Sequence, residues 1–281
     1  MIRIGLVGKT NTGKTTFFNA ATLASAEVSN YPFTTRRPSM GNTDAITICV
    51  HREFDIQDNP KNSRCVNGWR YIPIELIDLP GLIKGAWEGK GLGNQFLAVA
   101  AQSDALIHIV DVSGGIDATG RIAQPGTGDP IADVGDIEEE LAMWYLKLIE
   151  GNRDRISRAI RTGTDSIRAI ADVLRGVGVK EEHVRLAMNN NSMLSVEFDD
   201  YTAEKIKSFA WSLRVISKPT LILGNKIDLP FSADNFKRLR ERYKDFLVIP
   251  SSADAELTLR RAVSRGLIGY NPGDEGFEIN N

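Results

Sequence analysis

The sequence predicts an α/β fold in which a mostly parallel sheet is covered by helices on both faces and is interrupted by an inserted α-helical domain. Three observations support this: short apolar runs rich in β-branched residues alternate with helical segments, a glycine-rich loop follows the first run directly, and a helix-rich stretch separates two later runs. Alternating strands and helices favour a parallel sheet buried between helical layers. We therefore expect an α/β domain over residues 1–135 and 218–281 and a helical domain over 136–217.

Each expected element follows from its own pattern. The strands are the apolar runs at residues 2–7, 42–50, 71–78, 105–111, 219–224 and 246–250. Helices are expected near residues 14–25, 92–102, 232–244 and 253–265. In the inserted stretch, rich in Arg, Glu, Leu and Ile, the amphipathic pattern is clearest over Glu138–Ile149, Arg153–Leu174 and Thr202–Val215. Residues 113–136, rich in Gly, Pro and Asp, are expected to form a loop or connecting arm rather than core.

Composition sets wide bounds on function. With 281 residues, 42% of them hydrophobic, the chain can bury a sizeable core. The 34 basic and 36 acidic residues give a net charge of −2, so bulk charge does not favour nucleic acid, and we expect no DNA partner. No apolar run reaches the roughly 18 residues of a membrane-spanning helix, and Met1 passes straight into an expected strand without a signal peptide. We expect a cytoplasmic protein without a membrane partner.

The two cysteines, Cys49 and Cys65, cannot form a disulfide framework and indicate a reducing compartment. They flank a loop and could meet in the fold. A zinc site needs further ligands, and only His51 lies close to them in sequence. We interpret them as two ordinary thiols.

Residues Gly8 to Thr15 form a complete G-x-x-x-x-G-K-[ST] phosphate loop between the first expected strand and a helix. Glycines let backbone N–H groups turn toward phosphates, the Lys14 ammonium reaches the terminal phosphates, and the Thr15 hydroxyl takes a Mg²⁺ coordination site. The helix beginning near Lys14 adds its positive dipole end. The motif indicates a P-loop nucleoside-triphosphate-binding fold, with candidate nucleotide-binding residues Gly8, Asn11, Thr12, Gly13, Lys14, Thr15 and Thr16.

Two further segments suit the terminal phosphate. Asp78 ends the strand 71–78 and could hold Mg²⁺ through water, while the N–H of Gly81 could sense the phosphate; the alternative is a plain Asp-Pro-Gly turn. Thr35, after Tyr31-Pro32-Phe33-Thr34, could complete the Mg²⁺ coordination only when that phosphate is present, as a switch requires. The alternative is a proline-anchored surface loop. The candidate metal ligands are thus Thr15, Thr35 and Asp78.

The base is indicated by Asn225-Lys226-Ile227-Asp228, directly after the strand 219–224. The Asp228 carboxylate can accept hydrogen bonds from the N1–H and 2-amino groups of guanine, a pattern that adenine lacks, while Asn225 ties neighbouring loops together. Backbone N–H groups at Ser252 and Ala253, after the strand 246–250, could meet the guanine O6. All these motifs fall at the carboxyl ends of strands, where such sheets bind ligands.

The chain resembles a translation-factor-type GTPase of the Obg superfamily, in the YchF/Ygr210 branch and in its archaeal or eukaryotic form. This resemblance covers nearly the whole chain and rests on the segments 8–15, Asn30–Thr35, Asp78–Ala86 with Gly89–Gly93, Ser113–Asp117 and Arg265–Tyr270. It implies a Ras-like G domain, a coiled-coil-like helical insertion, and a small ubiquitin-like TGS domain that usually follows. Here the sequence stops at Gly273–Asn281, about where that domain would begin to form, and so leaves open a truncation or a form lacking it.

The base-reading motif bears on the choice between GTP and ATP. YchF-type relatives that accept ATP carry an Asn-x-x-Glu variant, whereas Asn225-Lys226-Ile227-Asp228 is intact here. We therefore expect GTP and GDP as ligands, with an ATP-preferring hydrolase of the same fold as the alternative. A P-loop kinase is a third class, but the sequence shows no second substrate lid.

The implied reaction is phosphoryl transfer to water, in which positioning and charge neutralisation by Lys14 and Mg²⁺ carry catalysis. Leu82 stands where Ras-like enzymes place a water-orienting glutamine, so we expect slow intrinsic turnover. Asn11 matches the phosphate-loop asparagine that holds K⁺ in some related GTPases, although it could equally cap the loop. The candidate catalytic residues are Lys14, Thr35, Gly81 and Asn11.

The partner is less determined. Family resemblance implies contact with the ribosome or RNA, and basic residues in the insertion could provide it. The alternative is a solvated helix face offset by Asp154, Asp165 and Asp172, which the composition favours. No feature specifies an oligomeric state, and we expect a monomer. The basic residues are Arg153, Arg155, Arg158, Arg161, Arg168, Arg175, Lys205 and Lys207.

Overall fold

The computed structural model of the chain describes residues 1–23, 38–54, 56, 58–82, 84–89, 93–272 and 274–280. Its main sheet has seven strands in the order β2-β4-β1-β5-β6-β7, with β3 (Arg64–Val66) on the outer part of β4. All pairs among β4, β1, β5, β6 and β7 are parallel, and β2 is antiparallel to β4. The expected mostly parallel sheet is confirmed. The strands are β1 (Ile2–Val7), β2 (Ser39–Ile48), β4 (Trp69–Asp78), β5 (Ala105–Asp111), β6 (Thr220–Asn225) and β7 (Leu247–Ser251).

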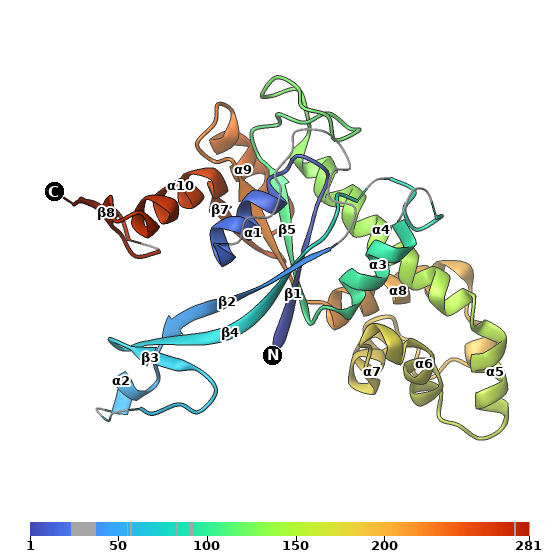
Figure 1. The fold of residues 1–281 in the computed structure, drawn as a ribbon. Coiled ribbons are helices and arrows are strands. Elements are labelled where there is room, and N and C mark those ends of the chain that lie inside the picture. Colours follow the sequence, from blue (N-terminus) through green and yellow to red (C-terminus); the bar gives the residue numbers. More distant parts are fainter. Residues whose placement is uncertain are drawn as a thin grey trace.

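Both faces of the sheet are covered (Figure 1). On one face Leu6, Ile109 and Leu223 pack with Phe18 of α1 (Lys14–Thr22), and α10 (Ala253–Ser264) lies against α1. On the other face the alternate strand residues pack beneath α3 (Gly93–Gln102), α4 (Pro130–Glu150) and α9 (Ser232–Arg242). The period of two in the strands thus divides their apolar residues between two cores.

The register gathers strand ends at one edge. Asp78 lies beside Leu6 in the β4–β1 pair, and Asp111, Asn225 and Ser251 are aligned across β5, β6 and β7. Parallel pairing produces this alignment because the carboxyl ends of all these strands point the same way. The edge therefore collects polar groups next to the loop that follows β1.

The expectation that residues 113–136 form a loop or connecting arm rather than core is wrong in detail. Ile116 is only 1% exposed, and α4 already begins at Pro130. The helix starts there because the Asp129 side chain caps the N–H of Ile131 and proline suits the first helical position. The first turns of α4 reach the sheet through Val134, so this helix joins both parts of the molecule.

Residues 153–174 form two helices rather than one. Helix α5 (Arg153–Arg161) ends before Gly163, whose φ is +96°, and Asp165 then caps α6 (Ser166–Leu174). Helix α7 (Glu181–Asn190) was not predicted, and α8 (Ala203–Ser217) packs along α4. One continuous apolar cluster contains Val7 of the sheet and Leu213 of α8, so the helical insertion and the sheet share a core.

The outer parts of β2 and β4 extend beyond β1, whose pairing with β4 begins at Ile74. With α2 (His51–Phe54) and β3 they form an arm that projects from the body (Figure 1). A second, two-stranded sheet pairs β8 (Ile268–Gly269) with β9 (Glu278–Ile279) near the C-terminus. Among the described residues, no helix has the length and apolar character required to span a bilayer.

Candidate functional site

The loop between β1 and α1 has the backbone of a phosphate loop. Gly8, Asn11 and Gly13 all have positive φ values, of 145°, 61° and 99°. A Cβ at Gly13 would collide with the side-chain amide of Asn225, and one at Gly8 with the carbonyl of Ile109. Glycine is required at both positions because the loop lies directly against the neighbouring strand ends.

Lys14 lies at the centre of this loop. Lys14 is 6% exposed, and its ammonium donates hydrogen bonds to the carbonyl of Gly8, at 3.1 Å, and to the carbonyl of Lys9. Burial lowers the pKa of Lys14 to about 8, against the opposing attraction of Asp78. A buried ammonium held by neutral carbonyls is suited to receive an anionic ligand.

Thr15 and Asp78 meet beside Lys14. The Thr15 hydroxyl donates to Asp78 Oδ2 at 2.6 Å, and Asp78 is 1% exposed. Burial raises the pKa of Asp78, while the Thr15 hydrogen bond and Lys14 oppose that shift. Among the described residues Asp78 Oδ1 has no hydrogen-bond partner. A hydroxyl next to a buried carboxylate oxygen that lacks a partner is a donor set that fits Mg²⁺. The third candidate ligand, Thr35, lies outside the described residues.

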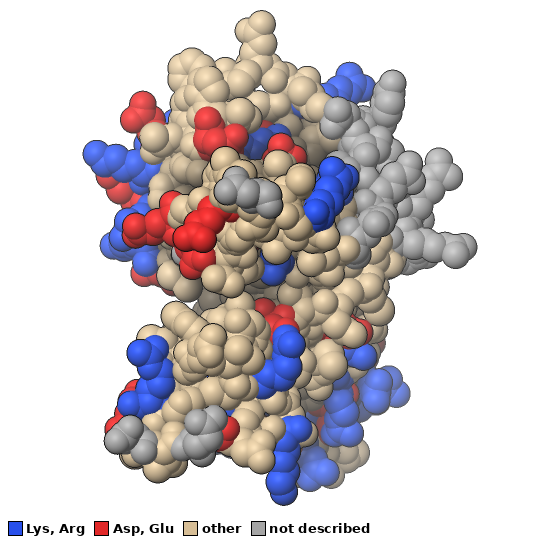
Figure 2. Space-filling model, turned by 60° about the vertical axis from the view of Figure 1, so that its left-hand side comes forward, with Lys and Arg blue, Asp and Glu red and all other residues tan. Residues whose placement is uncertain are grey.

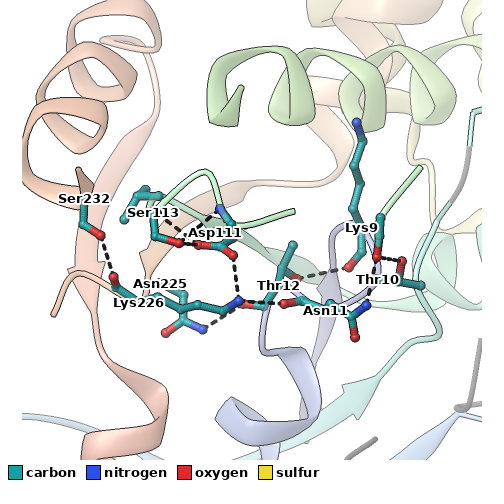
Figure 3. A network of polar contacts seen from close by, with 12 residues as sticks. Lys9, Thr10, Asn11, Thr12, Asp111, Ser113, Asn225, Lys226 and Ser232 are labelled. Carbon is teal, nitrogen blue, oxygen red and sulfur yellow. Dashed lines mark hydrogen bonds and ion pairs between the residues drawn. The ribbon is translucent and has the colours of Figure 1, made fainter. Parts of the chain in front are cut away.

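Asn225 joins three loops, as expected from the sequence. Its Nδ2 donates to the Thr12 carbonyl at 2.8 Å, and its Oδ1 accepts from the Ala253 N–H at 2.9 Å. Lys226 donates to the Asn11 carbonyl at 3.0 Å and to Asp111 Oδ2 at 2.6 Å (Figure 3). The phosphate loop is therefore fixed to the ends of β5 and β6.

A cavity of about 350 Å³ opens beside these contacts. Such a volume suits a small ligand or one ring system of a larger one. Asp228 is exposed at its wall, and the Ala253 N–H, expected at a base oxygen, is engaged by Asn225 Oδ1. Of the residues predicted from sequence, the cavity is lined by Asn11, Thr16, Asn225, Lys226, Asp228, Ser252 and Ala253.

Gly81 and Leu82 pass directly over the phosphate loop. A Cβ at Gly81 would collide with Thr10, and the Leu82 N–H donates to the Gly8 carbonyl at 3.1 Å. The Leu82 side chain is 3% exposed and packs in the core with Val7. Leu82 is thus a core residue and offers no polar atom to a bound water.

Asn11 contacts a segment that sequence reasoning treated as a connecting loop. Its Nδ2 donates to the Gly120 carbonyl at 2.9 Å, and the Thr10 hydroxyl donates to the same oxygen at 2.9 Å. Gly120 has a φ of +79° and accepts no Cβ, because Thr10 fills that space. The segment between β5 and α4 therefore forms one wall of the site.

Two important residues were missed from the sequence. Lys9 is 6% exposed and its ammonium contacts Asp133 at 2.7 Å and Asp136 at 2.8 Å, which ties the phosphate loop to α4. Asp111, also buried, accepts from Ser113 and Lys226. Lys9 occupies a variable position of the phosphate-loop motif, so the motif did not mark it as a functional residue. Asp111 was detectable as another carboxylate at a strand end.

Comparisons with known proteins agree with this geometry. The family model described as 50S ribosome-binding GTPase matches residues 3–131, and the Obg-like GTPase YGR210-like, G4 motif-containing domain matches residues 223–281. An uncharacterized GTP-binding protein of Methanocaldococcus jannaschii is 40% identical over 99% of this chain and 69% of its own length. One from Schizosaccharomyces pombe is 34% identical over 98% of this chain and 67% of its own length. The chain thus spans about two thirds of these relatives.

More distant relatives and a solved structure fit the same picture. The ribosome-binding ATPase YchF of Haemophilus influenzae is 31% identical over 79% of this chain and 56% of its own length. A crystal structure of a GTP binding protein from Pyrococcus horikoshii superimposes with a TM-score of 0.76 at 32% identity, covering 96% of this chain and 70% of that one. By these matches and by its phosphate-loop fold, the chain belongs to the Obg family of P-loop GTPases, in its YGR210-like branch, and so to a family of nucleoside triphosphate hydrolases.

Proposed function

We propose that this protein binds GTP and GDP and hydrolyses GTP slowly in the presence of Mg²⁺, as a molecular switch that acts in translation or ribosome function in the cytoplasm. The observation that carries the proposal is the position of Asn225, Lys226 and Asp228. Asn225, at the end of β6, and Lys226 fix the phosphate loop, and all three residues line the adjacent cavity. A ligand seated there would place its phosphates on the loop and its base against Asp228.

Guanine is the better base for this cavity. The Asp228 carboxylate accepts hydrogen bonds only, so it matches the N1–H and 2-amino groups of guanine and offers nothing to the N1 acceptor of adenine. The alternative, preference for ATP, has one argument in its favour: the matched YchF proteins are named ribosome-binding ATPases.

The roles of the other residues follow from their positions. Lys14 and the loop N–H groups bind the phosphates, and the Gly81 N–H senses the terminal one. Thr15 and Asp78 would hold Mg²⁺, together with Thr35, whose place lies outside the described residues. When bound, Mg²⁺ neutralises charge on the phosphates. Leu82, at the position where Ras-like enzymes place a water-orienting glutamine, has its side chain in the core, and slow turnover is the expected consequence.

K⁺ is a candidate cofactor through Asn11. The opposing reading, that Asn11 caps the loop, has support in its hydrogen bond to the Gly120 carbonyl. Turnover measured in K⁺ and in Na⁺ at equal ionic strength separates the two roles. A catalytic role requires faster turnover in K⁺ and loss of that difference in Asn11→Ala, whereas equal rates would leave Asn11 as a structural residue.

The base assignment is tested by titrating the protein with GDP, GTP, ATP and xanthosine triphosphate. We expect guanine nucleotides to bind best, and Asp228→Asn to lose that preference and gain affinity for xanthine, because an amide N–H can donate to the 2-oxo group. Asp254→Asn is the matched control, since Asp254 lines the same cavity. Retained guanine preference in Asp228→Asn, or its loss in Asp254→Asn, would refute the assignment.

Contact with the ribosome or RNA is proposed from the relatives' names rather than from surface charge. The arginines of the insertion are largely paired locally: Arg153 contacts Glu150 at 3.4 Å, and Arg161 contacts Asp199 at 2.8 Å. In the face that Figure 2 displays, acidic and basic side chains are interspersed, with more basic ones toward the bottom. Asp165 caps α6 instead of pairing with an arginine, while Asp172 pairs with Arg168 and Arg175.

Ribosome pelleting with GDP and with a non-hydrolysable GTP analogue, each at two salt concentrations, tests the partner. A switch predicts binding that depends on the nucleotide, and contact through basic residues predicts a fall with salt. Binding that ignores both would contradict a switch acting there. We further propose that residues 1–135 and 218–281 act as the G domain and 136–217 as its helical insertion, although α4 spans the first boundary.

A further inference from the structure

The arm formed by the outer parts of β2 and β4 lacks a hydrophobic core. Among its described residues, 44–54, 56 and 58–73, only Cys49 is buried, and it is 0% exposed. None of the hydrophobic clusters found among the described residues includes a residue between 45 and 72. A strand pair without a packed face is marginally stable in water, and small units of this kind are commonly fixed by a metal ion or a disulfide.

Three donor side chains converge at this point. Their sulfur and nitrogen atoms all lie within 4.8 Å of one another. Cys49 directly follows β2, His51 lies in α2 and Cys65 lies in β3. The Cys65 Sγ and His51 Nδ1 atoms are 3.4 Å apart. Two thiolates and an imidazole are ligands that select zinc among the common divalent metals.

Asp58 is the candidate for a fourth ligand: its carboxylate contacts Cys49, but it does not belong to the set of donors that all lie within 4.8 Å of one another. Its Oδ2 lies 3.4 Å from Cys49 Sγ. In a tetrahedral zinc site, Zn–S bonds of about 2.3 Å and Zn–N or Zn–O bonds of about 2.0–2.1 Å place a sulfur about 3.5 Å from a neighbouring nitrogen or oxygen ligand. The two separations of 3.4 Å, from Cys65 Sγ to His51 Nδ1 and from Cys49 Sγ to Asp58 Oδ2, agree with this value. A disulfide between the cysteines would require neither His51 nor Asp58.

Arg70 completes the cluster from outside. Its guanidinium lies against Cys49 Sγ, with Nε at 3.4 Å and a terminal nitrogen at 3.3 Å, and it pairs with Asp58. Two thiolates and a carboxylate carry three negative charges, which a divalent ion and one guanidinium balance. Outer donors to metal ligands hold those ligands in place and tune the site.

We propose that Cys49, His51, Cys65 and Asp58 bind one zinc ion, which fixes the tip of the β2–β4 arm. The ion occupies the position that a hydrophobic core would otherwise fill, since the only buried side chain of the described arm is a ligand. The sequence interpretation of the cysteines as ordinary thiols rested on the lack of further ligands, and Asp58, nine residues after Cys49, was not recognised as one.

Metal analysis of the full chain tests this site. The protein is purified without added zinc, stripped with a chelator under reducing conditions, and titrated with Zn²⁺ against a chromophoric competitor. We expect one tightly bound Zn²⁺ per chain. Titration with Co²⁺ should give a thiolate-to-cobalt charge-transfer band and the intense visible bands of tetrahedral coordination.

Matched variants assign the ligands. Cys65→Ser, His51→Asn and Asp58→Asn should each weaken Zn²⁺ binding at least about tenfold, which is the size of effect expected for groups that ligate or orient a metal. His183→Asn, in α7, should bind Zn²⁺ as the unaltered chain does. Far-UV circular dichroism of each variant checks that the rest of the fold is retained.

Three outcomes would overturn the proposal. The first is that the unaltered chain, when reduced, has no higher affinity for Zn²⁺ than the His51→Asn variant. The second is a chain that contains no metal and has a mass lower by two hydrogens before reduction, which identifies a Cys49–Cys65 disulfide. The third is a Co²⁺ complex without a charge-transfer band, which excludes thiolate ligands.

Discussion

Strand β4 belongs to two regions that fix their polar side chains in different ways. At its carboxyl end Asp78 lies within a sheet that is covered on both faces, next to Thr15 and Lys14. At its amino end Arg70 lies in the arm, where among the described residues only Cys49 is buried. Burial by distant elements positions the first group, whereas local contacts between polar side chains position the second. The two ends should therefore respond differently to the same kind of change.

The largest expected effect is that of Gly13→Val. A side chain at this position, where φ is +99°, collides with the Asn225 amide and forces the phosphate loop away from β6. We expect nucleotide affinity to fall at least about 100-fold, equivalent to about 3 kcal/mol, in a fluorescent-GDP titration. Zinc binding by the arm should not change.

Gly163→Val is the matched control for Gly13→Val. Gly163 has a similar φ of +96° but no atom within 4 Å of an added Cβ. Gly163→Val introduces the strain of a side chain at positive φ but no collision with a neighbouring atom. We therefore expect it to cost about 1–2 kcal/mol of stability and to leave nucleotide affinity unchanged. Equal loss of affinity in both variants would show that strain, and not contact with Asn225, is the cause.

Lys14→Met should stabilise the nucleotide-free fold while abolishing triphosphate binding. Burial lowers the pKa of Lys14 to about 8 from 10.5, so the folded chain binds fewer protons than the unfolded chain between these values, and stability rises with pH there. Below pH 8 folding desolvates a charge. We expect the variant to be more stable at pH 7 by roughly 1–3 kcal/mol, with the difference shrinking toward pH 10.

Chemical denaturation at pH 7, 8.5 and 10 measures the Lys14 effect. Lys218, whose pKa burial also lowers to about 8, is present in both proteins and cancels in the comparison. A stability difference that does not vary with pH would contradict a desolvated charge at Lys14.

Asn225→Ala should have an intermediate effect. It removes the hydrogen bonds to the Thr12 carbonyl and from the Ala253 N–H and leaves two buried backbone groups without these partners. We expect about 1–3 kcal/mol of lost stability and about tenfold weaker nucleotide binding. Asn235→Ala, which loses a bond to the Val112 carbonyl and an exposed bond from the Arg238 guanidinium, should cost less stability and leave affinity unchanged. If the two variants had equal effects on stability and affinity, the proposed role of Asn225 in linking the loops would be contradicted.

The same contrast explains how far the sequence could be interpreted. The phosphate loop, Asp78 and Asn225 were predicted because each follows an apolar strand at a fixed motif spacing, and parallel strands bring such ends together. The contact of Lys9 with Asp133 and Asp136 could not be predicted, because it depends on where α4 crosses the loop. The helix start at Pro130 was missed because the Gly-, Pro- and Asp-rich composition of residues 113–136 favours a loop, and the break at Gly163 was missed because apolar periodicity continues on both sides of it.

The arm was the hardest region to predict. Its donors at positions 49, 51, 58 and 65 are separated by irregular chain, so no periodicity marks them as neighbours. Pairing of β3 with the outer part of β4 brings Cys65 toward Cys49, and β3 was itself not predicted. A cluster that local loops create, rather than strand ends, leaves no spacing that is readable in one sequence.

The smallest effect on the whole fold should come from Cys49→Ser. No residue of the outer arm belongs to a hydrophobic cluster of the described chain, so loss of its metal should leave the unfolding midpoint of the sheet unchanged within error. The arm itself should open, because its one buried side chain no longer binds an ion.

Limited trypsin digestion measures this opening. Cleavage should become faster after the exposed Arg52, Lys61 and Arg64 of the arm, whereas the rate of cleavage after Arg242, which lies outside the arm, should not change. Thr47→Ala, an exposed change in the same arm, should leave all these rates unaltered. If Cys49→Ser instead lowered the midpoint of the sheet, the two ends of β4 would form a single cooperative unit, and the contrast between them would not hold.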